Sequence, residues 1–489
     1  MTFSEAASAI RRSCAGITSC LLGPALLSGC SFAPANVRPP LPVPQAYPGE
    51  NSAGSSVAAI GWRDFFRDDK LRALIAEALA NNRDIRIASG RVAEARAAWR
   101  IQGSALYPQL DAVATGTRAG TPADLSITGR SETGNQIYAQ ISAGWEIDFW
   151  GRLRNLNDAA RAQYLATEEA RRAVATELVA QVANGYLLER EYEERMALAQ
   201  RTITTREESL RIMKRRYEVG SGSKLDMTQA QTLLAQAQMA LQVLEQDQAV
   251  NRNALALLAG RQVAVAPGPL DLAEASADVA LPVGLPSELL VNRPDIVAAE
   301  YALRAANANI GAARAAFLPN ISLTGAFGTA SAELDGLFKD GSLAWNFAPA
   351  ISMPVFNAGR LAGRLDVAKA RQVIAVADYE RTVQAAFRDV ADSLVRRRQV
   401  GLQIETTGRM LAALRERARL AQLRFDNGRS TYLEVLDAQR DLFGTEQTLV
   451  QLHRAYLASA VSLYAALGGG FARNIPFATD MQQTGEFPR

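Results

Sequence analysis

The chain repeats its own pattern of hydrophobic and polar positions. Asn82-Arg83-Asp84-Ile85 returns as Arg293-Pro294-Asp295-Ile296, at an offset of 211 residues. Tyr217-Glu218-Val219-Gly220 returns as Phe425-Asp426-Asn427-Gly428, at an offset of 208 residues. Solenoid repeats run roughly 20 to 50 residues. A repeat of this length therefore indicates a duplicated half-domain.

Alternation of apolar and polar residues predicts a β-hairpin in each copy, at 110–149 and 320–355. One face of the second strand of each hairpin is apolar and rich in aromatic residues. In the first copy this face is Ile137, Ala139, Ile141, Ala143, Trp145, Ile147 and Phe149. In the second copy it is Leu343, Trp345, Phe347, Ile351, Met353 and Val355. Partner strands are expected at 110–118 and 321–329.

These four segments have the length of membrane-spanning strands, which need roughly 9 to 11 residues with apolar side chains outward. A half-buried soluble sheet would show the same alternation, but no other sheet is predicted with which the strands could pair. Four strands cannot close, because known barrels begin at about 8 strands and an open edge in lipid leaves backbone groups unpaired. We therefore expect two copies to form a barrel of roughly 8 strands, or three copies one of roughly 12.

Stretches without proline predict two long helices, at 153–219 and 360–427. Each would rise by about 100 Å. Short turns rich in glycine and serine follow, and the chain returns as helices at 225–258 and 431–467. Apolar and small residues spaced three and four apart on the return helices are typical of a coiled-coil seam. In the first copy the seam is Leu234, Ala237, Leu241, Leu244, Gln248, Asn251, Leu255 and Leu258.

The first residues are typical of a targeting segment, which we place at 1–29. Arg11 and Arg12 precede a short apolar stretch that ends at Leu27-Ser28-Gly29-Cys30. This ending resembles the bacterial lipobox, which implies diacylglycerol and an N-acyl chain on Cys30. An ordinary secretory signal with an incidental cysteine is the alternative. A proline-rich tether at 30–61 should then be extended.

Composition and charge exclude several classes of protein. Lys and Arg number 53 against 50 Asp and Glu, for a net charge of +3, so nucleic acid is not expected as a partner. The chain has one histidine, His453, and its cysteines lie at positions 14, 20 and 30. Neither a metal-ligand cluster nor a phosphate-binding glycine loop is found in the sequence, so an enzyme is not expected.

Several motifs together resemble the outer membrane factor family, the TolC-like efflux ducts, and within it the NodT-type lipoproteins. They are the lipobox, the Asn292-to-Glu300 segment, the Phe317-Leu318-Pro319 junction, and Phe425-Asp426-Asn427-Gly428 through Tyr432-to-Gln439. The resemblance implies a homotrimer with a 12-stranded β-barrel and a long periplasmic helical tunnel. The repeats would span 62–260 and 292–468, with an equatorial segment at 261–291 and a tail at 469–489.

The same resemblance implies partners and a location. The chain would sit in the outer membrane as the exit duct of a tripartite efflux or secretion system. It would work with a periplasmic adaptor and an inner-membrane pump, usually of the resistance-nodulation-division type, and the pump would select the cargo. A passive porin, or a structural lipoprotein that spans the envelope without a pump, is the alternative function.

The resemblance also implies a gate at the periplasmic tip, made by Leu433, Glu434 and Asp437. Glu434 has a second interpretation, because Thr431-x-x-Glu434 has the spacing of a helix-capping box. The tip turns, at Gly220, Gly222, Gly428 and Ser430, are candidate adaptor contacts. Phe425 and Ser430 stand where a tyrosine and an arginine help to hold the tip shut in the best-known family member. The bonds that close this tip are therefore left open by the sequence.

Overall fold

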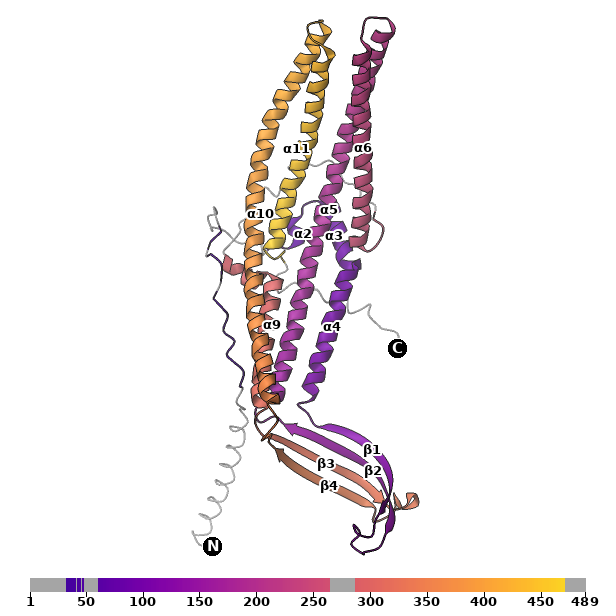
Figure 1. The fold of residues 1–489 in the computed structure, drawn as a ribbon, viewed down its shortest axis with the longest axis vertical. Coiled ribbons are helices and arrows are strands. Elements are labelled where there is room, and N and C mark those ends of the chain that lie inside the picture. Colours follow the sequence, from indigo (N-terminus) through magenta and orange to yellow (C-terminus); the bar gives the residue numbers. More distant parts are fainter. Residues whose placement is uncertain (1–31, 41, 45, 48–59, 264–285, 471–489) are drawn as a thin grey trace, which may run out of the picture. The chain divides into compact units, whose positions relative to one another are not determined.

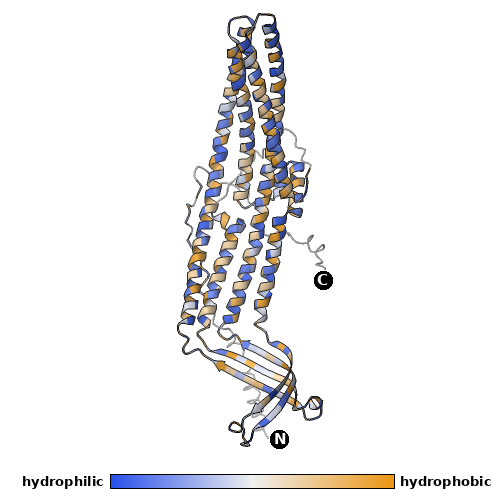
Figure 2. Ribbon diagram, turned by 45° about the vertical axis from the view of Figure 1, so that its right-hand side comes forward, coloured by the Kyte–Doolittle hydropathy of each residue, from blue (hydrophilic) through white to orange (hydrophobic). Residues whose placement is uncertain are grey.

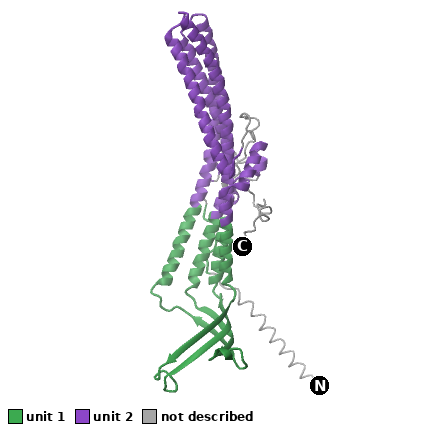
Figure 3. Ribbon diagram, turned by 90° about the vertical axis from the view of Figure 1, so that its right-hand side faces the viewer, with its two compact units in different colours: residues 1–40, 91–167, 299–379 green, residues 41–90, 168–298, 380–489 purple. Residues whose placement is uncertain are grey.

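The computed structural model describes residues 32–40, 42–44, 46–47, 60–263 and 286–470. The expected signal segment, Cys30, much of the tether, most of the equatorial segment and nearly all of the tail lie outside the described residues. The described chain forms two compact units, and several helices run through both (Figure 3). Unit 1 holds the sheet and the helical segments next to it, from residues 91–167 and 299–379, together with the N-terminal segment. Unit 2 holds the helical hairpins and their tips.

The order of the elements repeats between the two halves, as the duplication predicts (Figure 1). The first half contains α2 (Trp62–Phe65), α3 (Asp69–Asn81), α4 (Arg83–Ser104), β1 (Gln109–Thr121), β2 (Glu132–Ile147), α5 (Arg152–Glu218) and α6 (Lys224–Ala259). The second contains η2 (Pro286–Glu288), α8 (Leu289–Asn292), α9 (Pro294–Ala315), β3 (Asn320–Ser331), η3 (Leu334–Gly336), β4 (Leu343–Ser352), α10 (Arg360–Asp426) and α11 (Tyr432–Ala466).

The sheet of unit 1 joins the two copies. Its four antiparallel strands lie in the order β1-β2-β3-β4, so the second strand of one hairpin pairs with the first strand of the other. Ile141 is opposite Phe327 in that pairing. Large apolar side chains are exposed on the sheet, including Phe327 at 62% and Trp345 at 72%. Within the described residues β1 and β4 each have only one neighbouring strand, so both edges of the sheet are open.

The strands differ in length from the predicted ones. β1 and β2 are longer, and β2 begins at Glu132. β2 ends at Ile147 and β4 at Ser352, so Phe149, Met353 and Val355 lie beyond the strands to which the alternation assigned them. β4 ends at Ser352 because its partner β3 begins opposite it, at Asn320, so the residues after Ser352 have no strand beside them.

Small side chains let the helices of unit 1 approach closely. Ala159 of α5 and Ala305 and Ala308 of α9 belong to one buried alanine cluster. Next to it Trp99 of α4 stacks on Tyr164 of α5, with ring centroids 5.7 Å apart.

The N-terminal segment runs along α9 within unit 1. Asn307 of α9 donates to the side chain of Asn36, at 2.8 Å. Arg38 forms an ion pair of 2.7 Å with Glu300 of α9. A Cβ on Gly311 would lie 2.8 Å from the backbone nitrogen of Ala33, so a larger side chain would push the segment away.

In unit 2 each long helix pairs with its return helix, and the pairing of α5 and α6 depends on the only glycine within α5. A Cβ on Gly185 would lie 2.7 Å from the side chain of Leu255 of α6. The buried carboxylate of Glu189 accepts hydrogen bonds from Asn251 and Arg252 of α6. Figure 2 shows hydrophobic and hydrophilic residues interspersed along these helices.

The seam predicted on the first return helix matches the buried face at five of its eight positions. Ala237, Leu244, Gln248, Asn251 and Leu255 are buried, whereas Leu234, Leu241 and Leu258 are only half-buried. Ala230 and Leu233 begin the buried set instead, because α6 near its tip packs into a cluster with α5, α10 and α11. None of the helices in the described part of the chain is long and apolar enough to cross a membrane.

Candidate functional site

The first helical tip is the turn between α5 and α6, and it is closed by hydrogen bonds to the carbonyl oxygen of Arg216. The backbone N–H groups of Ser221 and Gly222 both donate to it, at 2.8 and 3.0 Å. Gly220 has a positive φ of 75°, a conformation that glycine adopts without steric cost. A Cβ on Gly222 would lie 2.9 Å from the Cβ of Arg216, so this turn also requires the second glycine.

α6 then begins with a side-chain cap. The hydroxyl of Ser223 accepts from the N–H of Asp226 at 3.1 Å, and it donates to the carboxylate of Asp226 at 2.8 Å. This satisfies a backbone donor that a helix start otherwise leaves unpaired. The carboxylate of Asp226 is thereby held within its own turn.

The second tip has the same turn and different side-chain pairs. Gly428 has a φ of 70°, and the N–H of Arg429 donates to the carbonyl of Arg424 at 2.8 Å. Thr431 is the N-cap residue of α11, yet its side chain accepts no capping hydrogen bond. Glu434 instead lies 3.3 Å from the guanidinium of Arg424. The geometry therefore favours an ion pair over a capping box for Glu434.

The predicted gate residues lie together in the first turns of α11. Leu433 is 48% exposed, and the side chain of Glu434 is 46% exposed. Asp437 is one turn further on and pairs with Arg440 at 3.3 Å. All three remain accessible in one chain, which fits residues that face a channel axis or another copy. Ser430 has a buried hydroxyl without a hydrogen-bond partner.

The tips are held together by an apolar cluster from four helices. It contains Met213 of α5, Ala230 and Leu233 of α6, Ala421 of α10, and Tyr432, Val435, Leu436 and Ala438 of α11. Phe425 packs against this cluster, and its ring centroid lies 5.0 Å from that of Tyr432. The guanidinium carbon of Arg216 lies 4.9 Å from the centroid of Phe425. An arginine of the first hairpin therefore contacts an aromatic ring of the second.

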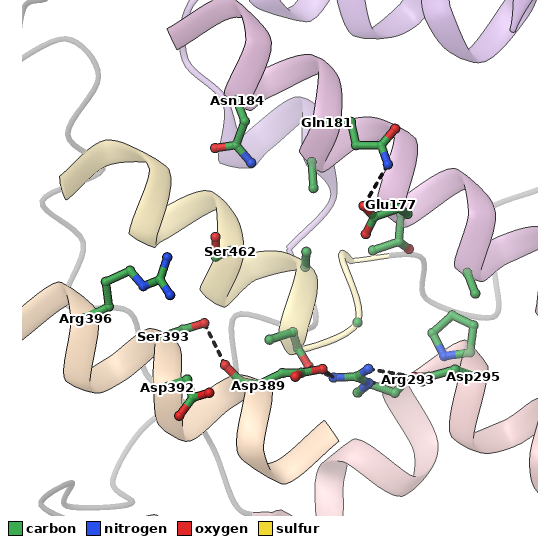
Figure 4. A pocket seen from close by; sticks show the side chains of 17 residues that line it. Glu177, Gln181, Asn184, Arg293, Asp295, Asp389, Asp392, Ser393, Arg396 and Ser462 are labelled. Carbon is green, nitrogen blue, oxygen red and sulfur yellow. Dashed lines mark hydrogen bonds and ion pairs between the residues drawn. The ribbon is translucent and has the colours of Figure 1, made fainter. Parts of the chain in front are cut away.

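A hollow of about 550 Å³ lies elsewhere in unit 2, where the end of α11 meets the start of α9 (Figure 4). Arg293 lies at its floor between Asp295 and Asp389, at 2.6 and 3.4 Å. Burial opposes the charge of Arg293, but its hydrogen bonds and ion pairs with both carboxylates outweigh this and raise its pKa. The Arg293-Pro294-Asp295 motif thus has a structural role: Arg293 also donates to the carbonyl of Ala466 and ties α11 to the start of α9.

Two features of the site were not found from the sequence. One is Arg216, whose role depends on which helix its side chain meets. The other is Arg206 of α5, which is buried, donates to the carbonyl of Leu233 at 2.6 Å, and lies 5.2 Å from the ring of Phe443 of α11. Burial lowers the pKa of Arg206. The position of Arg206 among apolar residues of a long helix was a sequence signal that could have indicated its buried contacts.

The fold agrees with one family. The profile of the outer membrane efflux protein family matches residues 74–261 and 285–469, one range in each half of the chain. The chain belongs to this family.

Relatives with known roles match over nearly the full length. The solvent efflux pump outer membrane protein SrpC of Pseudomonas putida is 43% identical over 459 residues, which cover 91% of this chain and 97% of the relative. The cation efflux system protein CusC of Escherichia coli K12 is 41% identical over 448 residues, which cover 91% and 97%.

Solved structures share the fold. A membrane protein from Pseudomonas aeruginosa superposes with a TM-score of 0.84 at 39% identity, covering 91% of this chain and 98% of that one. The MtrE outer membrane channel of Neisseria gonorrhoeae, solved in its open state, gives 0.83 at 37% identity, with 91% and 99% covered. The prediction of an outer membrane efflux protein with a duplicated, mixed helical and sheet fold is confirmed.

Proposed function

We propose that this chain is the outer membrane exit duct of a tripartite efflux system. The observation that carries the proposal is the sheet of four strands with two open edges and exposed apolar side chains, joined in the chain to two long helical hairpins. Such a sheet leaves backbone donors and acceptors unpaired in lipid unless other copies complete it. The names of the relatives, which are outer membrane proteins of efflux pumps, support the same conclusion.

The duct would be a homotrimer. Three copies of the sheet would give roughly 12 strands, within the range of known barrels, whereas one copy lies below that range. The apolar side chains of Phe327, Trp345 and Ile351 would then face lipid.

The chain would be anchored to the outer membrane by lipid as well as by the barrel. Cys30 would carry diacylglycerol and an N-acyl chain, with no other cofactor. The contacts of Asn36 and Arg38 with α9 support this proposal, since they would fix the segment that follows the lipid to the helices of unit 1.

Its partners would be a periplasmic adaptor and an inner-membrane pump of the resistance-nodulation-division type. The adaptor would contact the helical tips at Gly220, Gly222, Gly428 and Ser430. The named cargoes of the relatives differ, solvents for one and cations for another. The pump would therefore select the transported molecule, and this chain would conduct it across the outer membrane.

The gate would be formed by Leu433, Glu434 and Asp437 of three copies around one axis. Like charges brought together in a narrow passage repel unless cations or protons lie between them. The exposure of all three side chains supports this role.

The test is to purify the full chain in detergent, measure its mass, and record currents after insertion into a planar bilayer. A trimer that forms cation-preferring channels is the expected result. A stable monomer would overturn the barrel, and a trimer that never conducts would overturn the duct.

A further inference from the structure

A second hollow lies within unit 1, where β2 leads into α5 and β4 leads into α10 (Figure 1). Its volume is about 220 Å³. Three strands of the sheet line it with Glu146, Asn320 and Ser352, together with Ile147, the last residue of β2. The hollow shares no residue with the helical tips or with the gate.

The hollow opens on the polar face of the sheet. Asn320 is directly opposite Ser352, and Glu146 is directly opposite Ser322, two residues from Asn320. Opposite residues in neighbouring strands point to the same face, as do residues two apart in one strand. Ile321, between Asn320 and Ser322, points to the other face, which is apolar. In the proposed barrel the apolar face is toward lipid, so the hollow lies inside the duct.

The first copy of the repeat pairs its arginines with carboxylates at this hollow. Arg152 donates to both carboxylate oxygens of Glu146, at 2.7 Å each. Arg154 pairs with Asp148 at 3.2 Å, and the carboxylate of Asp148 also accepts from the backbone N–H groups of Leu153 and Arg154. Each carboxylate therefore has a cation of its own.

The second copy keeps the arginine and lacks the carboxylate. Arg360 is the counterpart of Arg152 at the offset of 208 residues, and Pro354 stands where the first copy has Glu146. Arg364 follows one turn later on α10. Both Arg360 and Arg364 line the hollow and are exposed. Within the described part of the chain, neither guanidinium group has an ion pair or a hydrogen bond.

This arrangement leaves positive charge without compensation. Like charges four residues apart on a helix repel each other and destabilise it. The start of α10 does not need a ligand, because the side chain of Asn357 accepts from the N–H of Leu361 at 3.3 Å. The two guanidinium groups are therefore what the hollow offers to an anion. Guanidinium groups bind the oxygens of carboxylates and similar anions through pairs of hydrogen bonds.

Much of the remaining wall is apolar. Trp150, Leu318, Pro319, Pro354 and Leu361 contribute to it. The indole N–H of Trp150 donates to the carbonyl of Pro319 at 2.8 Å, so this polar group already has its partner. Two unpaired cations beside apolar walls fit a ligand that is anionic at one end and apolar at the other. Pockets for drug-sized ligands measure roughly 300–1,000 Å³, so the ligand should be a small one.

We propose that this hollow binds small amphiphilic anions, a carboxylate or sulfonate joined to an apolar group, through Arg360 and Arg364. The proposal rests on the proposed duct, in which each copy brings one such hollow to the inside of the passage. The duct would then carry a site for anions in addition to its acidic gate.

The first test is calorimetric titration of the purified full chain in phosphatidylcholine nanodiscs with naphthalene-1-sulfonate. The parent should bind this anion more tightly than the neutral naphthalene-1-methanol, and added salt should weaken the binding. Inorganic phosphate, which has charge and no apolar part, should compete only weakly. Equal affinity for the sulfonate and the neutral probe, or for the sulfonate and phosphate, would overturn the assignment to amphiphilic anions.

Variants of the two arginines locate the binding. Arg360→Ala and Arg364→Ala should each raise the Kd for naphthalene-1-sulfonate about tenfold or more, the effect of losing a hydrogen bond to a charged group. Arg360→Lys keeps the charge without the planar fork and should lose less. Arg371→Ala is the matched control, since Arg371 is an exposed arginine of α10 in unit 1 that does not line the hollow. An unchanged Kd in Arg360→Ala, or an equal loss in Arg371→Ala, would contradict the site.

Pro354→Glu converts the second copy to the pattern of the first. The new carboxylate would have the same spacing from Arg360 that Glu146 has from Arg152. It should therefore occupy Arg360 and abolish binding of the sulfonate, while the neutral probe binds as before. Pro354→Gln supplies a side chain of the same size without charge and should bind the sulfonate like the parent. Equal sulfonate binding by Pro354→Glu and Pro354→Gln would count against the proposal.

Single-channel recording separates the site from the duct. Naphthalene-1-sulfonate should lower the conductance of the parent and leave that of Pro354→Glu unchanged. A parent that forms no channels would contradict the proposed duct. A parent that conducts, yet shows neither a calorimetric response nor a change in conductance with the sulfonate, would contradict the anion site alone.

Discussion

Gly260 ends α6 against the main-chain carbonyl of Asn81, so closely that a Cβ would lie 2.4 Å from that oxygen. The second copy repeats the contact: a Cβ on Gly468 would lie 2.5 Å from the carbonyl oxygen of Asn292. Both glycines also have a positive φ, of 74° and 108°. At each place the end of the return helix, α6 or α11, lies against the backbone just before the helix that leads to the strands, α4 or α9. The approach is so close that only glycine fits there.

Gly260→Ala and Gly468→Ala should therefore destabilise the protein. The left-handed backbone alone costs about 1–2 kcal/mol for a residue with a Cβ, and the clash with backbone atoms, which cannot rotate away, adds to it. Thermal unfolding followed by circular dichroism measures the effect. Gly408→Ala is the control, since Gly408 lies within α10 with nothing near its Cβ position, and it should be neutral or stabilising by up to about 1 kcal/mol.

The two helix caps give a second comparison between the copies. Ser223→Ala removes a hydroxyl that accepts from the N–H of Asp226 and should cost about 1 kcal/mol of local helix stability. Thr431→Ala should cost less, because the Thr431 side chain makes no capping bond. Hydrogen exchange of the first turns of α6 and α11 distinguishes the two. Equal losses of protection would show that Thr431 caps α11 in solution.

The main elements could be predicted because their signals are local. The absence of proline in 153–219 sets the length of α5, and alternation around Trp145 and Trp345 sets the strands. The strand ends were less accurate where the partner strand decides, as the start of β3 at Asn320 does for the end of β4 at Ser352. The contact partners of side chains could not be predicted from the sequence. Arg216 and Arg424 have nearly the same neighbours in sequence, yet one contacts Phe425 and the other Glu434 in the folded chain.

The contact of the N-terminal segment with α9 should depend on pH. Burial alone would raise the pKa of Glu300, but hydrogen bonds and ion pairs with Arg38 and Arg304 outweigh it and lower the pKa below the usual 4.5. A carboxyl group whose pKa is lower in the docked state stabilises docking above pH 4.5 and loses this contribution as the pH falls through its lowered pKa.

Hydrogen exchange of residues 32–40 should therefore be slow near neutral pH and accelerate, relative to the intrinsic rate, as the pH falls below 4.5 and through the lowered pKa of Glu300. In Glu300→Gln, residues 32–40 should exchange faster than in the parent at neutral pH, and their exchange should change little further in acid. A parent whose protection is the same at pH 3 and pH 7 would show that this ion pair does not hold the segment.

The lipid anchor is tested at Cys30. Cys30→Ser should abolish metabolic labelling with palmitate, because the sulfur and the new N-terminus that carry the acyl chains are lost. Some of the protein should still reach the outer membrane, since the barrel attaches it independently. Fractionation and labelling are measured together, and labelling that persists in Cys30→Ser would remove the lipoprotein assignment.

The charge at the gate gives the last prediction. In a trimer three copies of Asp437 would approach one axis, and their mutual repulsion is relieved by cations. Asp437→Ala should therefore weaken cation preference, read as the reversal potential of single channels in a salt gradient. Arg440→Ala should shift the reversal potential in the opposite direction, because Arg440 lies 3.3 Å from Asp437 and partly neutralises it.

Asp426→Ala is the matched control, since Asp426 is an exposed carboxylate at the end of α10 that accepts from Gln422 of its own helix. Glu434→Ala should cost at most about 1 kcal/mol of stability, as its pair with Arg424 is partly exposed on both sides. Opposite shifts for Asp437→Ala and Arg440→Ala, with Asp426→Ala unchanged, would place the charge of Asp437 in the ion path. If Asp437→Ala keeps both the conductance and the cation preference of the parent, Asp437 does not line the gate, and the constriction lies elsewhere along α11.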